Sequence, residues 1–229
     1  MGNEIRQIHT ISILGGTGKE GKGLAFRWAR AGYKIIIGSR SLEKAEAAVQ
    51  DIHSYLHETL SIEAMLNTDA AAAGDVVVLT VPFAFHQEML DSVKLQLQGK
   101  ILIDVTVPLV PPKVTKVQMP SAGSAAQEAQ QILGEAVQVV SAFQNISYEN
   151  LLTKEDIDCD VLICGSGKAA REIVLSLVKA AGLVGWDAGP LENSVVVEGL
   201  TSILIGINKQ FGVKSSGIKI TGVSGVGKN

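Results

Sequence analysis

The feature that most constrains this chain is a glycine-rich segment, residues 15–23, that directly follows a strand-like apolar stretch, residues 8–14. Gly16, Gly18 and Gly21 match the pattern Gly-x-Gly-x-x-Gly. Because glycine has no Cβ, such a segment can turn tightly, approach a pyrophosphate and let the next helix pack against the strand. The helix that follows points its free N–H groups at the phosphates. We therefore predict a dinucleotide-binding loop.

A second strand, predicted over residues 34–38, ends where a dinucleotide-binding protein contacts the adenine ribose. Proteins that bind NAD place an acid at this point, whereas this chain has Ser39 and Arg40. A hydroxyl and a guanidinium suit the 2′-phosphate of NADP(H). Lys44 lies about one helical turn beyond Arg40 and adds a second positive charge. The sequence therefore predicts NADP(H) rather than NAD(H).

Short β-branched segments alternate with helical segments along the chain, which is typical of a parallel sheet with helices on both faces. The predicted strands are residues 8–14, 34–38, 61–66, 76–81, 100–104, 137–143, 160–164 and 183–187. The predicted helices are residues 18–31, 42–56, 67–73, 85–97, 124–133, 168–181 and 190–211. The expected fold class is α/β, a Rossmann-type doubly wound parallel sheet with a smaller C-terminal α/β domain that contains a long apolar helix.

We expect two domains. Residues 1–143 form the NADP-binding Rossmann domain, and residues 144–229 form an acceptor-binding and dimerisation domain. The helix over 190–211 carries few charges, so we expect it to be buried on most sides, against the first domain, a second subunit or both. This makes a homodimer the expected assembly.

Composition excludes several classes of protein. The net charge of −3 and the lack of basic runs argue against a nucleic-acid partner. The apolar stretches are too short to span a bilayer, and residues 1–5 lack a signal-peptide pattern, so we expect a cytosolic protein without a membrane partner. Cys159 and Cys164 are interpreted as reduced core residues, and no metal site is predicted.

Acids and bases are scarce at the predicted carboxyl ends of the strands. His86 is interpreted as a helix-surface histidine, because nothing in the sequence supplies an orienting partner for it. Tyr148 and Lys168 are alternative proton donors. Hydride transfer between two flat heterocycles needs aligned rings in a dry cleft rather than an acid. The sequence favours that chemistry, and no catalytic residue is predicted.

The motifs together resemble the NADPH-dependent coenzyme F420 reductases over nearly the whole chain. The resemblance is carried by Ile-Leu-Gly-Gly-Thr-Gly (13–18), Gly-Lys-Gly-Leu-Ala (21–25), Gly-Ser-Arg with Lys44 (38–44), Leu-Thr-Val-Pro-Phe (79–83), Val-Leu-Ile-Cys-Gly (161–165), Asp-Ala-Gly-Pro-Leu-Glu-Asn-Ser (187–194) and Glu-Gly-Leu-Thr (198–201). It implies hydride exchange between NADP(H) and C5 of the 8-hydroxy-5-deazaflavin of coenzyme F420, a small-molecule co-substrate.

The same resemblance implies a set of binding residues. The pyrophosphate would be lined by Thr17, Gly18, Lys19 and Glu20, beside Gly16, and the 2′-phosphate would be held by Ser39, Arg40 and Lys44. Val81, Pro82 and Val107 would adjoin the cofactor. The deazaflavin would sit between the loop Gln144, Asn145 and Ile146 and the last helix, with Asn193 and Thr201.

The chain departs from the family's pattern on the deazaflavin side. Gln144 stands where a histidine is expected, Val195 where a basic residue is expected, and Gly199 where a hydroxyl is expected. Two alternatives therefore stay open. One is an NADP(H)-dependent reductase of another acceptor, such as a flavin, a small carbonyl or an imine. The other is a non-catalytic NADPH-sensing module whose output is a partner protein.

Overall fold

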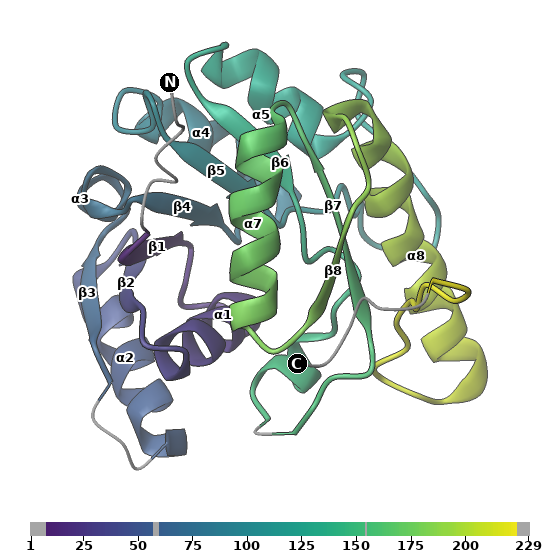
Figure 1. Ribbon diagram of the computed structural model, residues 1–229, viewed down its shortest axis with the longest axis horizontal. Coiled ribbons are helices and arrows are strands. Elements are labelled where there is room, and N and C mark those ends of the chain that lie inside the picture. Colours follow the sequence, from purple (N-terminus) through teal and green to yellow (C-terminus); the bar gives the residue numbers. More distant parts are fainter. Residues whose placement is uncertain (1–7, 57–59, 154, 224–229) are drawn as a thin grey trace.

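A single twisted sheet forms the centre of this computed structural model, which describes residues 8–56, 60–153 and 155–223 (Figure 1). Its strand order is β3-β2-β1-β4-β5-β6-β7-β8, and all neighbours pair in parallel except β6 with β7. The strands are β1 Thr10–Leu14, β2 Lys34–Ser39, β3 Ile62–Leu66, β4 Val76–Leu79, β5 Ile101–Asp104, β6 Gln138–Ser141, β7 Asp160–Gly165 and β8 Val184–Asp187.

Helices cover both faces of the sheet, so the predicted Rossmann-type doubly wound fold is confirmed. Side chains of α1, α2 and α7 share one apolar cluster with the sheet, and those of α3, α4 and α5 share the other. The helices are α1 Lys19–Arg30, α2 Leu42–Leu56, α3 Asn67–Ala73, α4 His86–Val93, α5 Ala125–Leu133, α6 Tyr148–Leu151, α7 Lys168–Ala180 and α8 Ser194–Phe211, with single 3₁₀ turns η1 Phe83–Phe85 and η2 Leu191–Asn193.

Each predicted strand and helix is present, with shifted ends. Strand β4 is Val-Val-Val-Leu with every residue buried, as expected for a strand covered on both faces. The helix predicted over 85–97 is shorter, because α4 ends at Val93 and the chain then turns through Gly99, whose φ is +74°. The four-residue helix α6 was not predicted. The N-terminal residues that bear on the localisation prediction lie outside the described part of the chain.

Contacts between α1 and the segment after β6 join the beginning of the chain to its later part. Trp28 packs edge-on against Phe143, with 5.6 Å between the ring centres, and its Nε1 donates to the Leu177 carbonyl at 2.8 Å. The Arg27 guanidinium donates to the carbonyl oxygens of Leu151, Asn150 and Glu155. Strand β7 also continues the sheet beside β6. The proposed division at residue 143 stays a prediction.

Helix α8 lies beside β7 at one side of the molecule (Figure 1). It buries Val197 and Leu204, but Val196, Ile203 and Phe211 are 64%, 51% and 68% exposed. Within a single chain the helix meets α5, β7 and η2 along one face, and its expected burial against a second subunit stays a prediction. Among the described helices, none is long and apolar enough to cross a membrane.

Candidate functional site

Of the three glycines in the Gly-x-Gly-x-x-Gly pattern, packing requires Gly16 and Gly21 but not Gly18. A Cβ on Gly16 would lie 2.7 Å from the Ile13 carbonyl oxygen, and one on Gly21 would lie 2.6 Å from Cα of Gly16. A Cβ on Gly18 would meet only the Gly15 carbonyl oxygen, at 3.7 Å. Because position 18 has no side chain, its backbone is accessible, and a ligand can approach it closely.

Helix α1 begins at Lys19, directly after this open backbone, so the N–H groups of its first turn point out of the loop. Thr17 is half-buried and Lys19 is exposed. The Lys19 ammonium lies 3.2 Å from the Tyr148 hydroxyl and 4.6 Å from the centre of the Tyr148 ring. The loop thus combines backbone donors, a helix N-terminus and a nearby cation, which are the elements of a pyrophosphate site.

The end of β2 presents the residues predicted for a 2′-phosphate. Ser39 is buried, and its Oγ accepts a hydrogen bond from the Ser41 amide at 3.3 Å. Arg40 and Lys44 are both exposed. The Arg40 guanidinium lies over the exposed Phe85 ring, 5.3 Å from its centre. This contact between β2 and η1 keeps a positive charge beside the glycine loop.

Val81 and Pro82 follow β4 at the same edge of the sheet. A Cβ on Gly15 would lie 2.7 Å from Cγ1 of Val81, so Val81 packs directly on the glycine loop. Thr80 donates its hydroxyl hydrogen to the Leu14 carbonyl at 3.0 Å and braces that contact. Pro82 is exposed. The structure therefore brings the loop after β4 against the loop after β1.

A cleft of about 350 Å³ opens next to this loop, between α1, the loops after β5 and β6, and α8. Six predicted site residues line it: Glu20, Val107, Gln144, Asn145, Ile146 and Thr201. Apolar side chains supply much of the remaining lining, namely Val105, Leu109, Phe143, Leu204 and Ile205. The rest of the cleft lining consists of Ser147, Tyr148, Asn208, Lys214 and Ser216.

Hydrogen bonds fix the polar residues of this cleft. Nε2 of Gln144 donates to the Asp104 carbonyl at 2.7 Å, and Nδ2 of Asn145 donates to the Val197 carbonyl at 2.9 Å. The Thr201 hydroxyl donates to the Gln144 carbonyl at 2.9 Å. These hydrogen bonds connect strand β5, the loop after β6 and helix α8 around the cleft. Both amide side chains have a defined orientation before any ligand binds.

Three polar atoms in the cleft lining are buried and lack a hydrogen-bond partner among the residues that the structure describes. They are Oε1 of Gln144, Oδ1 of Asn145 and Oε1 of Glu20. Native proteins rarely leave such groups unpaired, so each one indicates a missing partner. Their concentration in one cleft, beside a dinucleotide loop, is typical of a small-molecule site.

Glu20 has an unusual electrostatic environment. Burial raises the pKa of its carboxyl group to about 8, because an ionised carboxylate there would be poorly solvated. The helix N-terminus at α1 favours the ionised form but does not offset the burial. Burial thus favours the protonated form of this carboxyl group.

His86 is not the surface histidine that the sequence suggested. It is fully buried, with Nε2 at 2.8 Å from Oδ2 of Asp104 and Nδ1 at 3.1 Å from Oε1 of Glu128. Burial lowers its pKa, but the charges and hydrogen bonds of Asp104 and Glu128 outweigh this and raise the pKa to about 9. The signal that could have revealed this was Asp104, a buried acid at the end of a strand next to β4.

A second buried acid, Glu198, was also missed. Its carboxylate accepts the amides of Ala125 and Ala126, at 2.7 and 3.1 Å, and so caps the N-terminus of α5 from helix α8. Ser124 and Ser194 bond each other beside it at 2.7 Å. Burial raises the pKa of Glu198 to about 8, while the two amide donors and His86 lower it. Neither Glu198 nor His86 lines the cleft, so both act as structural groups behind it.

Other candidate residues lie away from the cleft. Asn193 is exposed, and its Nδ2 donates to the Ala188 carbonyl at 2.6 Å. Val195 and Gly199, where the chain departs from the expected pattern, are absent from the described cleft lining. Lys168 is exposed at the start of α7, and its ammonium lies 3.8 Å from Glu172.

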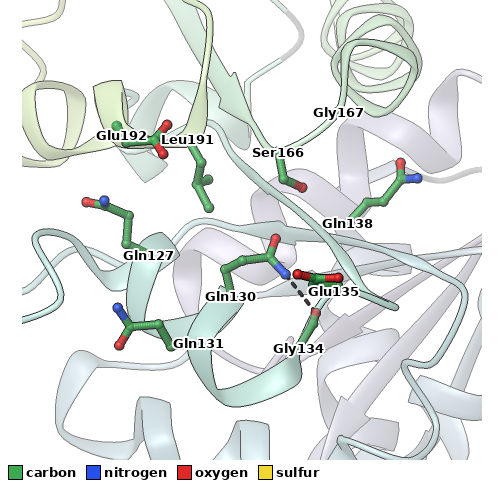
Figure 2. A pocket seen from close by; sticks show the side chains of 10 residues that line it. All are labelled: Gln127, Gln130, Gln131, Gly134, Glu135, Gln138, Ser166, Gly167, Leu191 and Glu192. Carbon is green, nitrogen blue, oxygen red and sulfur yellow. Dashed lines mark hydrogen bonds between the residues drawn. The ribbon is translucent and has the colours of Figure 1, made fainter.

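A larger depression of about 680 Å³ lies elsewhere, between α5, the β6 and β7 ends, and η2 (Figure 2). Its lining is rich in glutamine, and it contains none of the predicted site residues. Gln130 already donates to the carbonyls of Gly134 and Val137, so it holds the turn after α5. We therefore take the smaller cleft at the glycine loop as the functional site.

Comparison with known proteins agrees with this geometry. A family model described as NADP oxidoreductase, coenzyme F420-dependent, matches residues 10–108. The chain is 41% identical over 220 residues to the F420-dependent NADP reductase of Methanocaldococcus jannaschii, covering 92% of this chain and 97% of that one. It is 39% identical to the enzyme of that name from Methanothermobacter thermautotrophicus, over 93% of this chain and 95% of the relative.

A solved structure from Arthrobacter sp. FB24, described as a candidate F420-dependent NADP reductase, superposes with a TM-score of 0.79. It covers 94% of this chain and all of the other chain, at 22% identity, and so supports the fold alone. Pyrroline carboxylate reductase of Plasmodium falciparum gives a TM-score of 0.59 at 14% identity, over 90% of this chain and 66% of its own.

Proposed function

The chain belongs to the coenzyme F420-dependent NADP oxidoreductase family, and on this premise we propose that it is an enzyme that transfers a hydride directly between NADP(H) and coenzyme F420. The observation that carries the proposal is that one cleft joins the dinucleotide loop to the amide groups after β6. Glu20, in the first turn of α1, lines the same cleft as Gln144, Asn145 and Thr201. A nicotinamide and a second flat ring can therefore meet there.

On the NADP(H) side, the open backbone at Gly18 and the start of α1 bind the pyrophosphate, with Gly16, Thr17 and Lys19 around it. Ser39, Arg40 and Lys44 bind the 2′-phosphate. The stacking of Arg40 on Phe85 supports this role, because it holds the guanidinium at the ribose end of the loop. Val81, Pro82 and Val107 adjoin the nicotinamide end.

On the acceptor side, the deazaflavin lies between the loop of residues 144–146 and helix α8. The side-chain carbonyl oxygens of Gln144 and Asn145, which have no partner among the described residues, accept N–H groups of a heterocycle. Thr201 holds this loop, whereas Asn193 acts further away, at the start of the helix. Lys214 lines the cleft in place of a basic residue at position 195, which supports contact with the anionic tail of the coenzyme.

The chemistry needs alignment and exclusion of water. When NADPH is bound, it supplies the hydride, and the residues of the cleft keep the donor and acceptor carbons roughly 3–3.5 Å apart. Water is excluded from the space between the two rings by the apolar walls of the cleft, which are formed by Val105, Val107, Phe143, Leu204 and Ile205.

Residues 144–229 would serve as the acceptor-binding and dimerisation part of the protein. The exposed apolar stripe on α8, formed by Val196, Ile203, Ile207 and Phe211, supports a homodimer in which a second copy covers it. A cytosolic location is part of the same proposal. The buried free thiols of Cys159 and Cys164 fit a reducing compartment.

The deciding experiment mixes the purified protein with NADPH and oxidised coenzyme F420 and follows the loss of the visible absorbance of the deazaflavin. Rapid bleaching that is slower with NADH would support both halves of the proposal. Clear NADPH binding without bleaching would reject the acceptor and favour a flavin, carbonyl or imine reductase, or an NADPH-sensing module.

A further inference from the structure

Glu20 brings a carboxyl group to a cleft in which it shares the lining with the apolar side chains of Val105, Val107 and Phe143. Its Oε1 is buried and has no hydrogen-bond partner within the described residues. A carboxylate held in this way would lose its solvation without gaining donors. Burial therefore favours the neutral acid, which has a proton to donate.

The other charged or titratable side chains around the cleft are engaged or exposed. The Tyr148 hydroxyl lies 3.2 Å from the Lys19 ammonium, and Lys214 is exposed after α8. On α1, the ammonium of Lys22 lies 2.9 Å from the carboxylate of Asp51 and forms an ion pair with it. Gln144, Asn145 and Thr201 do not titrate. Glu20 is thus the acid of the described cleft that has a buried, unpaired carboxyl oxygen.

We infer that Glu20 is the proton donor that accompanies hydride transfer, an inference that rests on the proposed function. Reduction of oxidised coenzyme F420 by NADPH consumes one hydride and one proton. The C–H bond at C4 of the nicotinamide breaks, and a C–H bond forms at C5 of the deazaflavin. The electron pair displaced in the deazaflavin comes to rest on a ring nitrogen, which takes the proton as the Glu20 O–H bond breaks.

The charges balance at both ends of this step. Before transfer, a neutral acid faces the neutral dihydronicotinamide of NADPH. After transfer, the carboxylate and the ring of NADP⁺ carry opposite charges within the same cleft and attract each other. A proton from water restores the acid after product release. In the opposite direction, the carboxylate accepts the proton.

The test compares the whole protein with Glu20→Gln, which keeps the shape and hydrogen-bonding capacity of the side chain but cannot release a proton. Glu172→Gln, an exposed substitution on α7, is the matched control. Stopped-flow bleaching of coenzyme F420 by NADPH is recorded from about pH 6 to about pH 10. NADPH binding is measured in parallel by fluorescence titration.

We expect Glu20→Gln to slow bleaching at pH 7 by about 100-fold, within the range of general acid catalysis. The wild-type rate should fall as pH rises through about 8, the pKa to which burial raises Glu20, and the variant should lack this fall. The dissociation constant of Glu20→Gln for NADPH at pH 7 should stay within about 3-fold of the wild-type value, because a neutral acid and a neutral amide differ little in binding.

A second readout needs no acceptor. The infrared difference spectrum between wild type and Glu20→Gln should contain a protonated carboxyl band at pH 7 that disappears above about pH 8. An ionised Glu20 at pH 7, or a variant that bleaches at the wild-type rate, would overturn the inference alone. If wild type binds NADPH and shows the band but never bleaches coenzyme F420, the proposed function fails and this acid role fails with it.

Discussion

Nε2 of His86 lies 2.8 Å from Oδ2 of Asp104, and both side chains are completely shielded from solvent. The backbone carbonyl of the same Asp104 accepts the side-chain N–H of Gln144 in the cleft. Glu128 holds the other ring nitrogen of His86 at 3.1 Å. A buried ion pair between α4 and β5 therefore stands directly behind a residue proposed to contact the acceptor.

Replacing His86 with glutamine should destabilise the protein by about 3–5 kcal/mol, because it leaves the carboxylate of Asp104 buried without its cationic partner. Urea unfolding monitored by circular dichroism measures this change. His9→Gln, at an exposed histidine, is the control and should unfold like wild type. A His86→Gln protein that also unfolds like wild type would show that the pair is not charged.

The contribution of His86 to stability should decrease at high pH. Its pKa is raised in the folded protein from 6.5 to about 9, so the stabilisation is fully present below pH 6.5 and is lost as pH rises through about 9. The difference in unfolding free energy between wild type and His86→Gln should shrink over this window, by at most about 1.4 kcal/mol per pH unit. A difference that is constant from pH 6 to pH 10 would contradict the raised pKa.

Arg40→Ala should weaken NADPH binding by about 10- to 100-fold, as expected for the loss of hydrogen bonds between a guanidinium and a phosphate. NADH binding should change little, because NADH has no 2′-phosphate. Fluorescence titration with both nucleotides measures the ratio. Arg30→Ala, at an exposed arginine at the other end of α1, is the control. An equal loss for NADH and NADPH would mean that Arg40 does not read the 2′-phosphate.

Two glycine substitutions should separate folding from binding. Gly21→Ala should lower the melting temperature, because its Cβ would lie 2.6 Å from Cα of Gly16. Gly18→Ala has room for its Cβ and a φ of −71°, so its melting temperature should match that of wild type while NADPH binds more weakly. Differential scanning calorimetry and nucleotide titration test both. Unchanged NADPH binding by Gly18→Ala would remove Gly18 from the pyrophosphate site.

Ile203→Glu should convert a dimer to monomers, because it places a charge in the exposed apolar stripe of α8. Sedimentation velocity should show the apparent mass falling by half. Lys209→Glu, on the same helix but at a charged exposed position, is the control. A monomeric wild-type protein at micromolar concentration would reject the dimer proposal.

The NADP(H) half of the site could be predicted from the sequence because its parts are local. Gly16, Gly18 and Gly21 are close neighbours in the chain, and the strand that leads to Arg40 follows within one βαβ unit. Short-range spacing and the absence of a Cβ define such a loop before any tertiary contact forms. The structure then distinguishes the glycines that packing requires from the one that faces open space.

The state of the buried ionisable groups in and behind the cleft could not be predicted in the same way. His86 and Glu128 are 42 residues apart and come from different helices, and nothing local indicates that they face each other. The burial of Glu20 also depends on segments far along the chain, which complete its cleft. Burial decides the charge of both groups, and burial is a property of the assembled fold.

By itself, the sequence determined the alternation of strands and helices, the dinucleotide loop and the expected preference for NADP(H), because each follows from periodicity or from residues close in the chain. Tertiary structure alone decided which side of α8 stays exposed, that His86 is a buried ion-pair partner, and that Glu20, Gln144 and Asn145 bring to one cleft buried oxygens without a partner in the described part of the chain. The physical reason is that solvation and pairing depend on which distant segments meet, and that is settled only when the sheet and its helices pack together.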